Sequence, residues 1–452
     1  MSSNRSSFTG KIGFVLAAAG SAVGLGNIWR FPYLAAHYGG GIFLLVYIAL
    51  AVTFGFTLMI AEIAIGRKTQ LSTIGAFRAL DKRFSFVGIL AAVIPAIILP
   101  YYSVIGGWVM KYVADFASGQ GATMAQSDFF ASYIGSTWEP LLWFFLFIAL
   151  TALVVFFGVE KGIEKVSKFM MPLLVVLILF VAIYTICTMD GAWDGVIYYI
   201  KPDFSKLSVM TVVSAMGQLF YSMSLAMGIM ITFGSYMKKD ISIEKSARQI
   251  ELFDTAIAFL AGLMIIPAVF AFSGGDESAL GQGPGLMFVT LPKIFESMPA
   301  GSVIAVTFFV MVFFAALTSS ISLMETMVSI VCDKTRLQRK PCCLIVFVGA
   351  LLLGIPSSLG YSAWSSIKLI GMQVLDFFDF ISNSILMPIV ALATCVFIGY
   401  FLKPQTLVDE IELTGTFKQK KFFSVSMRYI APVCILLILL SSVLSAFGII
   451  TI

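Results

Sequence analysis

The sequence predicts an all-α integral membrane protein, and three observations support this fold class. Only 12% of the 452 residues are charged and the mean hydropathy is +0.98, whereas a soluble domain carries about 25% charged residues. Apolar runs long enough to cross a bilayer, which takes about 20 residues, recur along the whole chain. Two of these runs are interrupted by glycines and polar side chains. We therefore expect one multi-span bundle, residues 1–452, without a soluble domain.

The spacing of the apolar runs predicts eleven transmembrane helices, at 11–36, 41–66, 87–113, 139–158, 164–186, 209–236, 247–273, 299–331, 341–356, 367–401 and 427–450. The first ten form two halves of five spans, 11–186 and 209–401, and 427–450 is an added eleventh helix. Lysine and arginine gather in the odd-numbered loops, which places the N-terminus in the cytoplasm by the positive-inside rule. The net charge of +5 thus reflects topology in the lipid bilayer, and it gives no reason to expect a nucleic-acid partner.

The first span does not have the composition of a closed helix. Gly20, Gly24 and Gly26 each weaken a helix by about 1 kcal/mol relative to alanine, and Asn27 and Arg30 place polar groups near membrane depth. Irregular backbone persists at that depth only where it is buried in protein or lines a watery cavity, so a helix broken around a ligand is one interpretation. The other is close packing of small residues between helices, which explains the glycines but neither Asn27 nor Arg30.

The sixth span repeats this pattern with Gln218, Ser222, Ser224 and Gly228 between apolar runs. Interruptions at corresponding places in two halves are typical of transporters with inverted repeats and a binding site at the midplane. An intramembrane enzyme is disfavoured, because the chain has one histidine, His37, and no nucleophile with a base in reach. A channel would need a continuous pore. No organic cofactor is expected, since the glycines of the first span lack the third glycine and the strand of a dinucleotide loop.

Four stretches carry a resemblance to a known family: Gly20 to Pro32, Tyr101 with Tyr102, Ser222 with Ser224, and Phe313 to Ser320. They resemble the bacterial neurotransmitter:sodium symporters of the leucine-transporter type, over essentially the whole chain. The resemblance implies an inverted five-plus-five helix repeat with broken helices 1 and 6. It also implies sodium-coupled import of an amino acid by alternating access, across the inner (plasma) membrane of a bacterium.

The resemblance further implies two sodium sites. Neutral carbonyl and hydroxyl oxygens suffice for sodium, because each need only replace a water molecule. The first site would combine the substrate carboxylate with Ala22, Asn27, Ser222 and Asp254, and the second would combine the carbonyls of Gly20, Val23 and Ala315 with the hydroxyls of Thr318 and Ser319.

Asp254 is where the chain departs from the family, which usually has asparagine in this part of the seventh span. Its carboxylate is either a sodium ligand or the charge that replaces chloride, and both alternatives predict chloride independence. A third interpretation is an acid near the cytoplasmic start of the helix, because Glu251 lies only one turn earlier.

The resemblance also implies the substrate pocket. The amides of Leu25 and Gly26 and the hydroxyl of Tyr102 would bind a carboxylate, and carbonyls near Tyr221 and Ser224 would bind an ammonium group. Relatives that carry amines have aspartate at the position of Gly24, so an α-amino acid is expected. The flexible Met227, where relatives often have phenylalanine, favours large hydrophobic and aromatic substrates. The expected pocket comprises Ala22, Gly24, Leu25, Gly26, Ile98, Tyr102, Ile105, Tyr221, Ser222, Ser224, Met227, Ser320 and Leu323.

Two gates are expected. Outside, Arg30 would pair with Asp379 or Asp376, with Gln218 bridging and Tyr221 as a lid. Inside, we expect a pair formed by Arg5 and Asp333, supported by Tyr236 and Phe8, while Glu62 would hydrogen-bond the break in span 6.

A proton-coupled amino-acid transporter of the same architecture is the alternative. It would carry a titratable group where this chain has Thr318 and Ser319.

Overall fold

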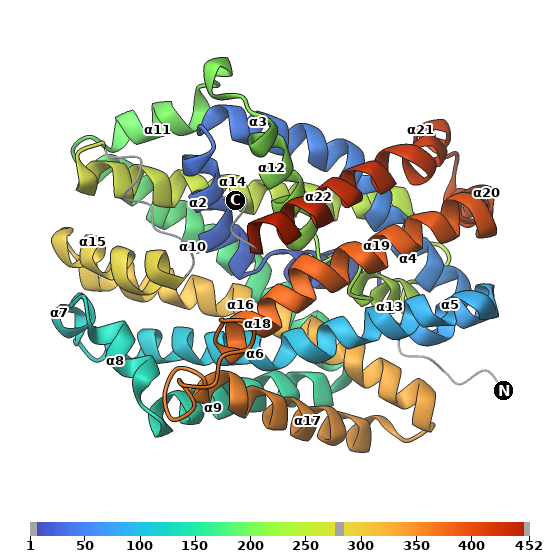
Figure 1. The fold of residues 1–452 in the computed structure, drawn as a ribbon, viewed down its shortest axis with the longest axis horizontal. Coiled ribbons are helices and arrows are strands. Elements are labelled where there is room, and N and C mark those ends of the chain that lie inside the picture. Colours follow the sequence, from blue (N-terminus) through green and yellow to red (C-terminus); the bar gives the residue numbers. More distant parts are fainter. Residues whose placement is uncertain (1–6, 276–283, 447–452) are drawn as a thin grey trace.

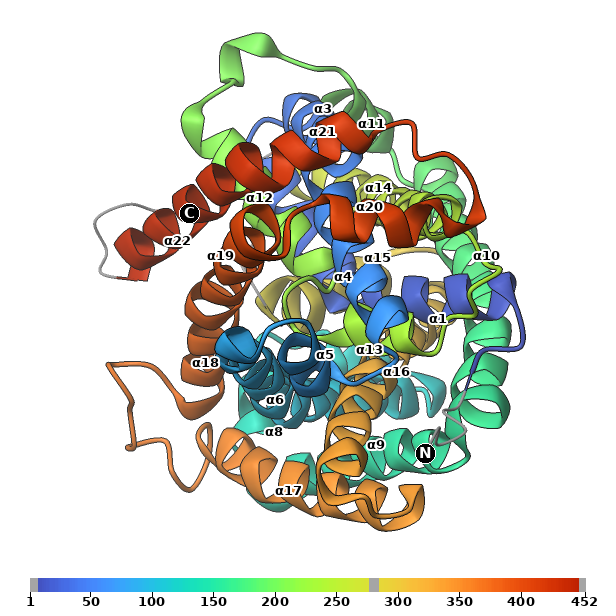
Figure 2. The same ribbon diagram turned by 90° about the vertical axis from the view of Figure 1, so that its right-hand side faces the viewer.

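The regular elements of the protein are helices, most of which run along one long axis (Figure 1). The computed structural model describes residues 7–275 and 284–446. Short helices mark the two ends of the bundle (Figures 1 and 2). We call the end with α5 (Thr73–Leu80), α13 (Ile229–Ser235) and α20 (Gln405–Ile411) the proximal end, and the end with α7 (Gly121–Met124), α11 (Ala192–Ile200) and α15 (Leu291–Ser297) the distal end.

Within the described residues, nine helices are long and apolar enough to cross a membrane: Gly41–Thr69, Lys82–Ala117, Trp138–Phe156, Val159–Thr188, Ile243–Ser273, Gly301–Thr335, Arg339–Leu359, Val374–Leu402 and Lys420–Ser445. A tenth is the bent pair Lys11–Ala22 and Gly26–His37, whose parts meet at 55°. The sixth predicted span consists of α12 (Val209–Ser222) and α13, each too short to span alone. The number of eleven spans stays a prediction.

Several of the long helices consist of consecutive α-helical and π-helical segments. Span 1 is α1 (Lys11–Ala22), η1 (Gly26–Arg30) and α2 (Phe31–His37), and span 2 is α3 (Gly41–Leu50), η2 (Ala51–Gly55) and α4 (Phe56–Thr69). Next come η3 (Lys82–Phe84), α6 (Ser85–Ala117), α8 (Phe129–Gly135), α9 (Trp138–Phe156), η4 (Val159–Glu164) and α10 (Lys165–Thr188). The second half contains η5 (Phe204–Lys206), α12, α13, α14 (Ile243–Ser273), η7 (Leu286–Thr290), α16 (Gly301–Thr335) and α17 (Arg339–Leu359), followed by α18 (Val374–Asp379), η8 (Phe380–Leu386), α19 (Met387–Val396) and η9 (Phe397–Leu402). The chain then continues through η10 (Glu412–Thr414), α21 (Lys420–Val425), η11 (Ser426–Ile430) and α22 (Ala431–Ala446).

The bundle has central and peripheral helices. The central α14 and α16 are mostly buried, whereas α9, α17 and α22 turn most of their surface outward. Large apolar side chains such as Leu153, Leu344 and Leu437 are exposed on the outer helices, as expected where lipid tails cover the surface. The helices around α1 and α16 therefore supply the interior in which polar groups are found.

Several predicted boundaries were wrong. The tenth span begins at Val374 rather than 367, because Ile370 and Gly371 both have positive φ and form a turn. The ninth extends to Leu359 through Pro356. Two segments between predicted spans contain helices, namely α11 between spans 5 and 6 and α15 between spans 7 and 8. The glycine-rich segment that follows span 7 lies partly outside the described residues.

Candidate functional site

The first span is interrupted directly after Ala22, where Val23 adopts an extended backbone and the helix resumes at Gly26. Side chains satisfy polar groups that the interruption frees. Asn27 accepts a hydrogen bond on Oδ1 from the Gly24 amide (3.1 Å), and Gln218 donates from Nε2 to the Gly26 carbonyl (2.9 Å). The break is thus supported by its own asparagine and by a glutamine of α12.

The sixth span is interrupted between Ser222 and Ile229. Within the gap, Ser224 and Ala226 have φ of 53° and 62°, a left-handed conformation that is uncommon for residues other than glycine. The Ala226 amide donates to Glu62 Oε1 (2.7 Å), which confirms the expected contact of Glu62 with this break. Ser224 Oγ donates to the Ser21 carbonyl (2.9 Å), so the two breaks touch each other.

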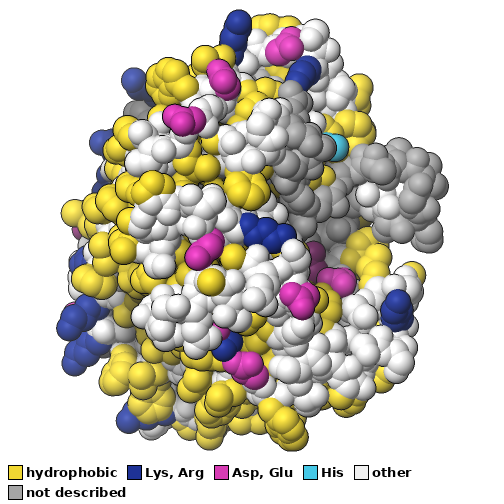
Figure 3. Space-filling model, turned by 90° about the vertical axis from the view of Figure 1, so that its left-hand side faces the viewer, with side chains coloured by type: hydrophobic (Ala, Val, Ile, Leu, Met, Phe, Trp, Pro, Cys, Tyr) yellow, Lys and Arg dark blue, Asp and Glu magenta, His cyan; other side chains and the backbone are white. Residues whose placement is uncertain are grey.

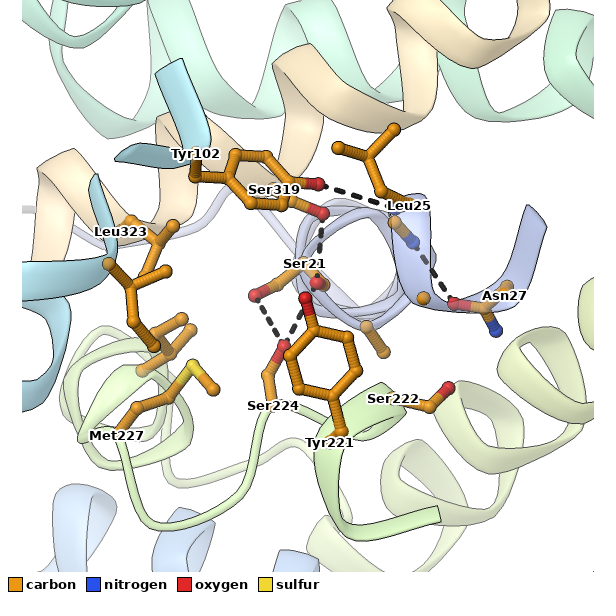
Figure 4. A pocket seen from close by; sticks show the side chains of 15 residues that line it. Ser21, Leu25, Asn27, Tyr102, Tyr221, Ser222, Ser224, Met227, Ser319 and Leu323 are labelled. Carbon is orange, nitrogen blue, oxygen red and sulfur yellow. Dashed lines mark hydrogen bonds between the residues drawn. The ribbon is translucent and has the colours of Figure 1, made fainter. Parts of the chain in front are cut away.

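A small cavity of about 40 Å³ lies between the two breaks. Tyr102 points toward it from α6, Tyr221 from α12 and Met227 from the interruption of span 6 (Figure 4). This volume exceeds the roughly 10–15 Å³ needed by one water molecule, so the cavity has room for a few waters. Its lining residues are Ser21, Ala22, Gly24, Leu25, Gly26, Asn27, Ile98, Tyr102, Tyr221, Ser222, Ser224, Met227, Ile229, Ser319 and Leu323.

Most of the predicted pocket residues line this cavity, but two do not. Ser320 lies within hydrogen-bond distance of Thr151 on α9, with 3.1 Å between their hydroxyl oxygens. Ile105 lines a separate cavity nearer the distal end. Both residues lie on the predicted helices, but Ser320 faces α9 and Ile105 faces the distal cavity. Conversely, Ser21 and Ile229 line the cavity although the sequence analysis did not select them.

Two glycines allow aromatic side chains to approach the first break. A Cβ atom on Gly24 would stand 2.8 Å from Ser319 Oγ and 3.0 Å from the Tyr102 hydroxyl. A Cβ atom on Gly26 would stand 2.6 Å from the Tyr221 ring. Because the space over Gly24 is kept open, the Tyr102 hydroxyl can accept a hydrogen bond from the Leu25 amide (3.3 Å). The tyrosine and the amide therefore occupy one wall of the cavity together (Figure 4).

Asp254 on α14 is fully buried and faces the breaks. Its carboxylate accepts hydrogen bonds from Ser222 Oγ (2.7 Å), Asn27 Nδ2 (2.8 Å) and the Tyr47 hydroxyl (3.4 Å). These three partners are uncharged. The sequence left open whether Asp254 lies at the ion site or near the cytoplasmic start of its helix, and the structure brings it together with Asn27 and Ser222. Tyr47 was missed, because it lies in an apolar run of α3 without a polar neighbour to mark it.

A second group of oxygens gathers between α1 and α16. Ser319 Oγ lies 3.4, 3.1 and 3.1 Å from the carbonyl oxygens of Gly20, Ser21 and Val23. Thr318 Oγ1 donates to the Ala315 carbonyl (3.2 Å). The predicted residues of the second sodium site thus supply neutral oxygens from two neighbouring helices, which is a suitable donor chemistry for sodium. The Ser21 carbonyl adds an oxygen that was not predicted.

A cavity of about 310 Å³ toward the distal end is lined by Arg30, Tyr221, Asp376 and Asp379 among others. Figure 3 views this end of the molecule, where acidic and basic side chains are scattered among hydrophobic ones. Arg30 lies over the Tyr221 ring at 5.4 Å. Asp379 accepts hydrogen bonds from Tyr101 (3.0 Å) and from Asn383 (2.7 Å).

The predicted outer pair of Arg30 with Asp379 or Asp376 is not formed here, because none of the ion pairs among the described residues joins them. Gln218 is committed to the Gly26 carbonyl rather than bridging the two charges. Arg30, Asp376 and Asp379 instead line the same cavity of about 310 Å³.

At the proximal end, the described residues form contacts that were not predicted. Tyr236 donates to Glu325 Oε1 (2.7 Å), and Glu325 forms an ion pair with Arg339. Asp333 accepts a hydrogen bond from the Ser72 amide (2.7 Å). Arg5 lies outside the described residues. The pair of Glu325 and Arg339 was missed, because an acid within a long apolar helix gives no sign of which basic residue it meets.

A second unpredicted contact ties the start of span 1 to span 5. Glu164 Oε2 accepts a hydrogen bond from the Thr9 amide (2.9 Å), and Lys168 pairs with the same carboxylate (2.6 Å). Phe8, which was expected at this gate, packs edge-on against Phe233 and Tyr236. The base of α1 is therefore held against both α10 and α13.

Two facing broken helices inside a bundle of apolar spans, with clustered oxygens and a small cavity between them, define a secondary membrane transporter. Residues 5–122 and 132–449 match the model of the sodium:neurotransmitter symporter family. The chain belongs to this family, and it is therefore a multi-pass, sodium-dependent membrane transporter rather than an enzyme.

Relatives and a solved structure agree with this assignment. The sodium-dependent transporter YhdH of Bacillus subtilis is 36% identical over 439 residues, which cover 95% of this chain and 96% of YhdH. A sodium-dependent transporter of Haemophilus influenzae is 32% identical, with 97% and 98% covered. The crystal structure of MhsT in complex with L-phenylalanine is similar with a TM-score of 0.87 and 38% identity, over 97% of this chain and 100% of that one.

Proposed function

We propose that the protein imports hydrophobic and aromatic L-amino acids together with sodium ions, by alternating access and without chloride. The observation that carries the proposal is the narrow cavity between the two breaks, which combines a hydroxyl-and-amide wall with apolar side chains. The similar transporter MhsT was crystallised with L-phenylalanine, which supports an amino acid of this kind.

Each part of an amino acid has a matching part of the cavity. The Leu25 amide and the Tyr102 hydroxyl, 3.3 Å apart, are donors for the carboxylate. Amides at the start of a helix also favour a negative group through their dipoles. The unwound backbone near Tyr221 and Ser224 offers carbonyls for the ammonium group. Ile98, Met227 and Leu323 line the apolar part of the cavity.

Two sodium ions are the proposed co-transported cargo. The first would lie among Asp254, Asn27, Ser222, the Ala22 carbonyl and the substrate carboxylate, so that substrate and ion stabilise each other. The second would lie among the Gly20, Val23 and Ala315 carbonyls and the hydroxyls of Thr318 and Ser319. The hydroxyls now donate to neighbouring carbonyls, and a bound ion would rotate them so that their lone pairs face it.

Chloride independence follows from Asp254 in this proposal. Its carboxylate is buried among uncharged partners beside the first ion site, so one negative charge is already present where two cations must gather. A second, mobile anion is then unnecessary.

Alternating access would open the two ends in turn, with the gate contacts biasing the equilibrium by a few kcal/mol. The roles of Arg30, Asp379, Gln218 and Tyr221 at the distal end, and of Asp333 and Tyr236 at the proximal end, belong to this proposal. In this proposal the protein lies in the plasma membrane of a bacterial cell, with the proximal end and the N-terminus in the cytoplasm, and the basic loops support this orientation.

The test is uptake of labelled tryptophan and leucine into proteoliposomes that contain the purified protein. One set receives an inward sodium gradient, and a second receives a proton gradient without sodium, each with chloride or with gluconate. We expect uptake with sodium only, at equal rates in both anions. Uptake driven by protons alone would contradict the sodium sites and favour the proton-coupled alternative, and uptake that requires chloride would contradict the role of Asp254.

A further inference from the structure

A groove of about 610 Å³ runs along the outer surface between α9 and α17. On α9 it is lined by Ala149, Ala152, Leu153 and Phe156, which share one helical face. On α17 it is lined by Lys340, Pro341, Cys343, Leu344 and Phe347. The hollow exists because the two alanines are short while the side chains on both sides of them are long. It is distinct from the transport cavity, which lies between spans 1 and 6.

The groove opens toward the membrane rather than into the protein. Leu153 is 53% exposed and Leu344 is 62% exposed. Both lie on helices that turn most of their surface outward. Hydrocarbon is the solvent on this face of a multi-span bundle, so a groove lined by these side chains must contain acyl chain.

The proximal end of the groove is positively charged. Lys340 lies at the start of α17 with its Nζ 5.2 Å from the centre of the Phe156 ring, and it is exposed. Arg339 beside it is neutralised by Glu325, which leaves Lys340 as the groove's own cation. The first amides of α17, a helix of 21 residues, add the partial positive charge of a helix N-terminus at the same place.

We propose that this groove binds one phospholipid with an anionic headgroup from the leaflet at the proximal end. One acyl chain lies along Ala149, Ala152 and Leu344, and the headgroup phosphate meets Lys340 and the start of α17. The apolar groove accepts the acyl chain of any phospholipid, whereas the cation at its interfacial end favours a headgroup with a net negative charge over a zwitterionic one. A bound lipid of this kind bridges α9 and α17.

The experiment is native mass spectrometry of the full-length protein in mild detergent, titrated with phosphatidylglycerol or with phosphatidylcholine of the same chains. We expect one phosphatidylglycerol to be retained in preference to phosphatidylcholine. The variant Lys340→Gln is expected to lose about fivefold in phosphatidylglycerol affinity, the factor that one surface lysine contributes toward anionic lipid. Its phosphatidylcholine affinity is expected to stay unchanged.

Two further variants make the test specific. Lys421→Gln removes an exposed lysine from α21, away from the groove, and is expected to bind like the wild type. Ala152→Phe fills the groove and is expected to remove the retained lipid while Lys340 is intact. If Ala152→Phe does not fold, Ala149→Leu places a smaller obstruction in the same groove.

The proposal is overturned if Lys340→Gln binds phosphatidylglycerol like the wild type, or if both lipids lose affinity equally. It is also overturned if soluble glycerol 3-phosphate competes as well as the diacyl lipid, because the headgroup alone would then account for binding. Each of these measurements is independent of transport.

Discussion

The substitution Asp254→Asn is the sharpest perturbation of the ion site, because it removes a charge without changing the shape. Ser222 and Asn27 both donate to the same carboxylate oxygen, Oδ1, at 2.7 and 2.8 Å, and an amide oxygen in that place can still accept both bonds. Two unit charges about 4 Å apart attract by about 4 kcal/mol at an effective dielectric constant of 20. Since about 1.4 kcal/mol is tenfold, we expect the half-saturating sodium concentration to rise at least tenfold, with a limit of about a thousandfold.

The assay is leucine uptake into proteoliposomes over a sodium series, with choline as the replacing cation. Glu251→Gln is the matched control, because it neutralises an acid on the same helix one turn earlier, and we expect wild-type sodium dependence from it. Adding chloride to Asp254→Asn separates the two roles of the carboxylate. Recovery of uptake indicates that it replaces an anion, and continued impairment indicates a sodium ligand. Wild-type sodium dependence in Asp254→Asn, with and without chloride, would refute the reasoning.

Three further predictions concern the cavity. Gly24→Ala places a Cβ atom 3.0 Å from the Tyr102 hydroxyl. Because overpacking costs about 1–3 kcal/mol, substrate affinity in a binding assay should fall roughly 5- to 150-fold. Unchanged affinity would contradict the geometry. Ser319→Ala removes one hydroxyl, typically about 0.5–1.5 kcal/mol, so half-saturating sodium should rise about 2- to 10-fold, whereas Ser320→Ala, which faces α9, should leave it unchanged. Met227→Phe stiffens the apolar wall, so competition assays should show tryptophan losing about tenfold relative to leucine, and an unchanged ratio would exclude Met227 from selectivity.

The interruptions of spans 1 and 6 could be predicted from the sequence because their causes are local. Gly24, Gly26 and Asn27 weaken or cap the helix within a few residues of one another, and the chain bends by 55° at that point. The same holds for the gap between the two halves of span 6, where Ser224 and Ala226 depart from helical backbone. Such features depend on neighbouring residues, so a single chain reveals them.

Hydrogen-bond and ion-pair partners on different helices could not be predicted in the same way. Tyr236 was expected to support a pair of Arg5 and Asp333, and its hydrogen bond to Glu325, eight residues before Asp333 on α16, was not predicted. Which acid it meets depends on the depth of α13 in the bundle and on Arg339, which pairs with Glu325. Helical periodicity constrains the face of a residue but not the height of its partner. For the same reason Tyr47 was missed beside Asp254.

The contact between Glu62 and Ala226 has a consequence for the energetics of binding. A carboxylate of α4 occupies the place of the helical carbonyl that Ala226 would otherwise need, at 2.7 Å. The gap in span 6 is therefore part of the folded protein before any substrate arrives. Binding energy is not consumed in unwinding a helix inside the bilayer, and the entropy of ordering that segment has already been lost on folding. A neighbouring helix thus holds the unwound segment of span 6 in place before a substrate binds.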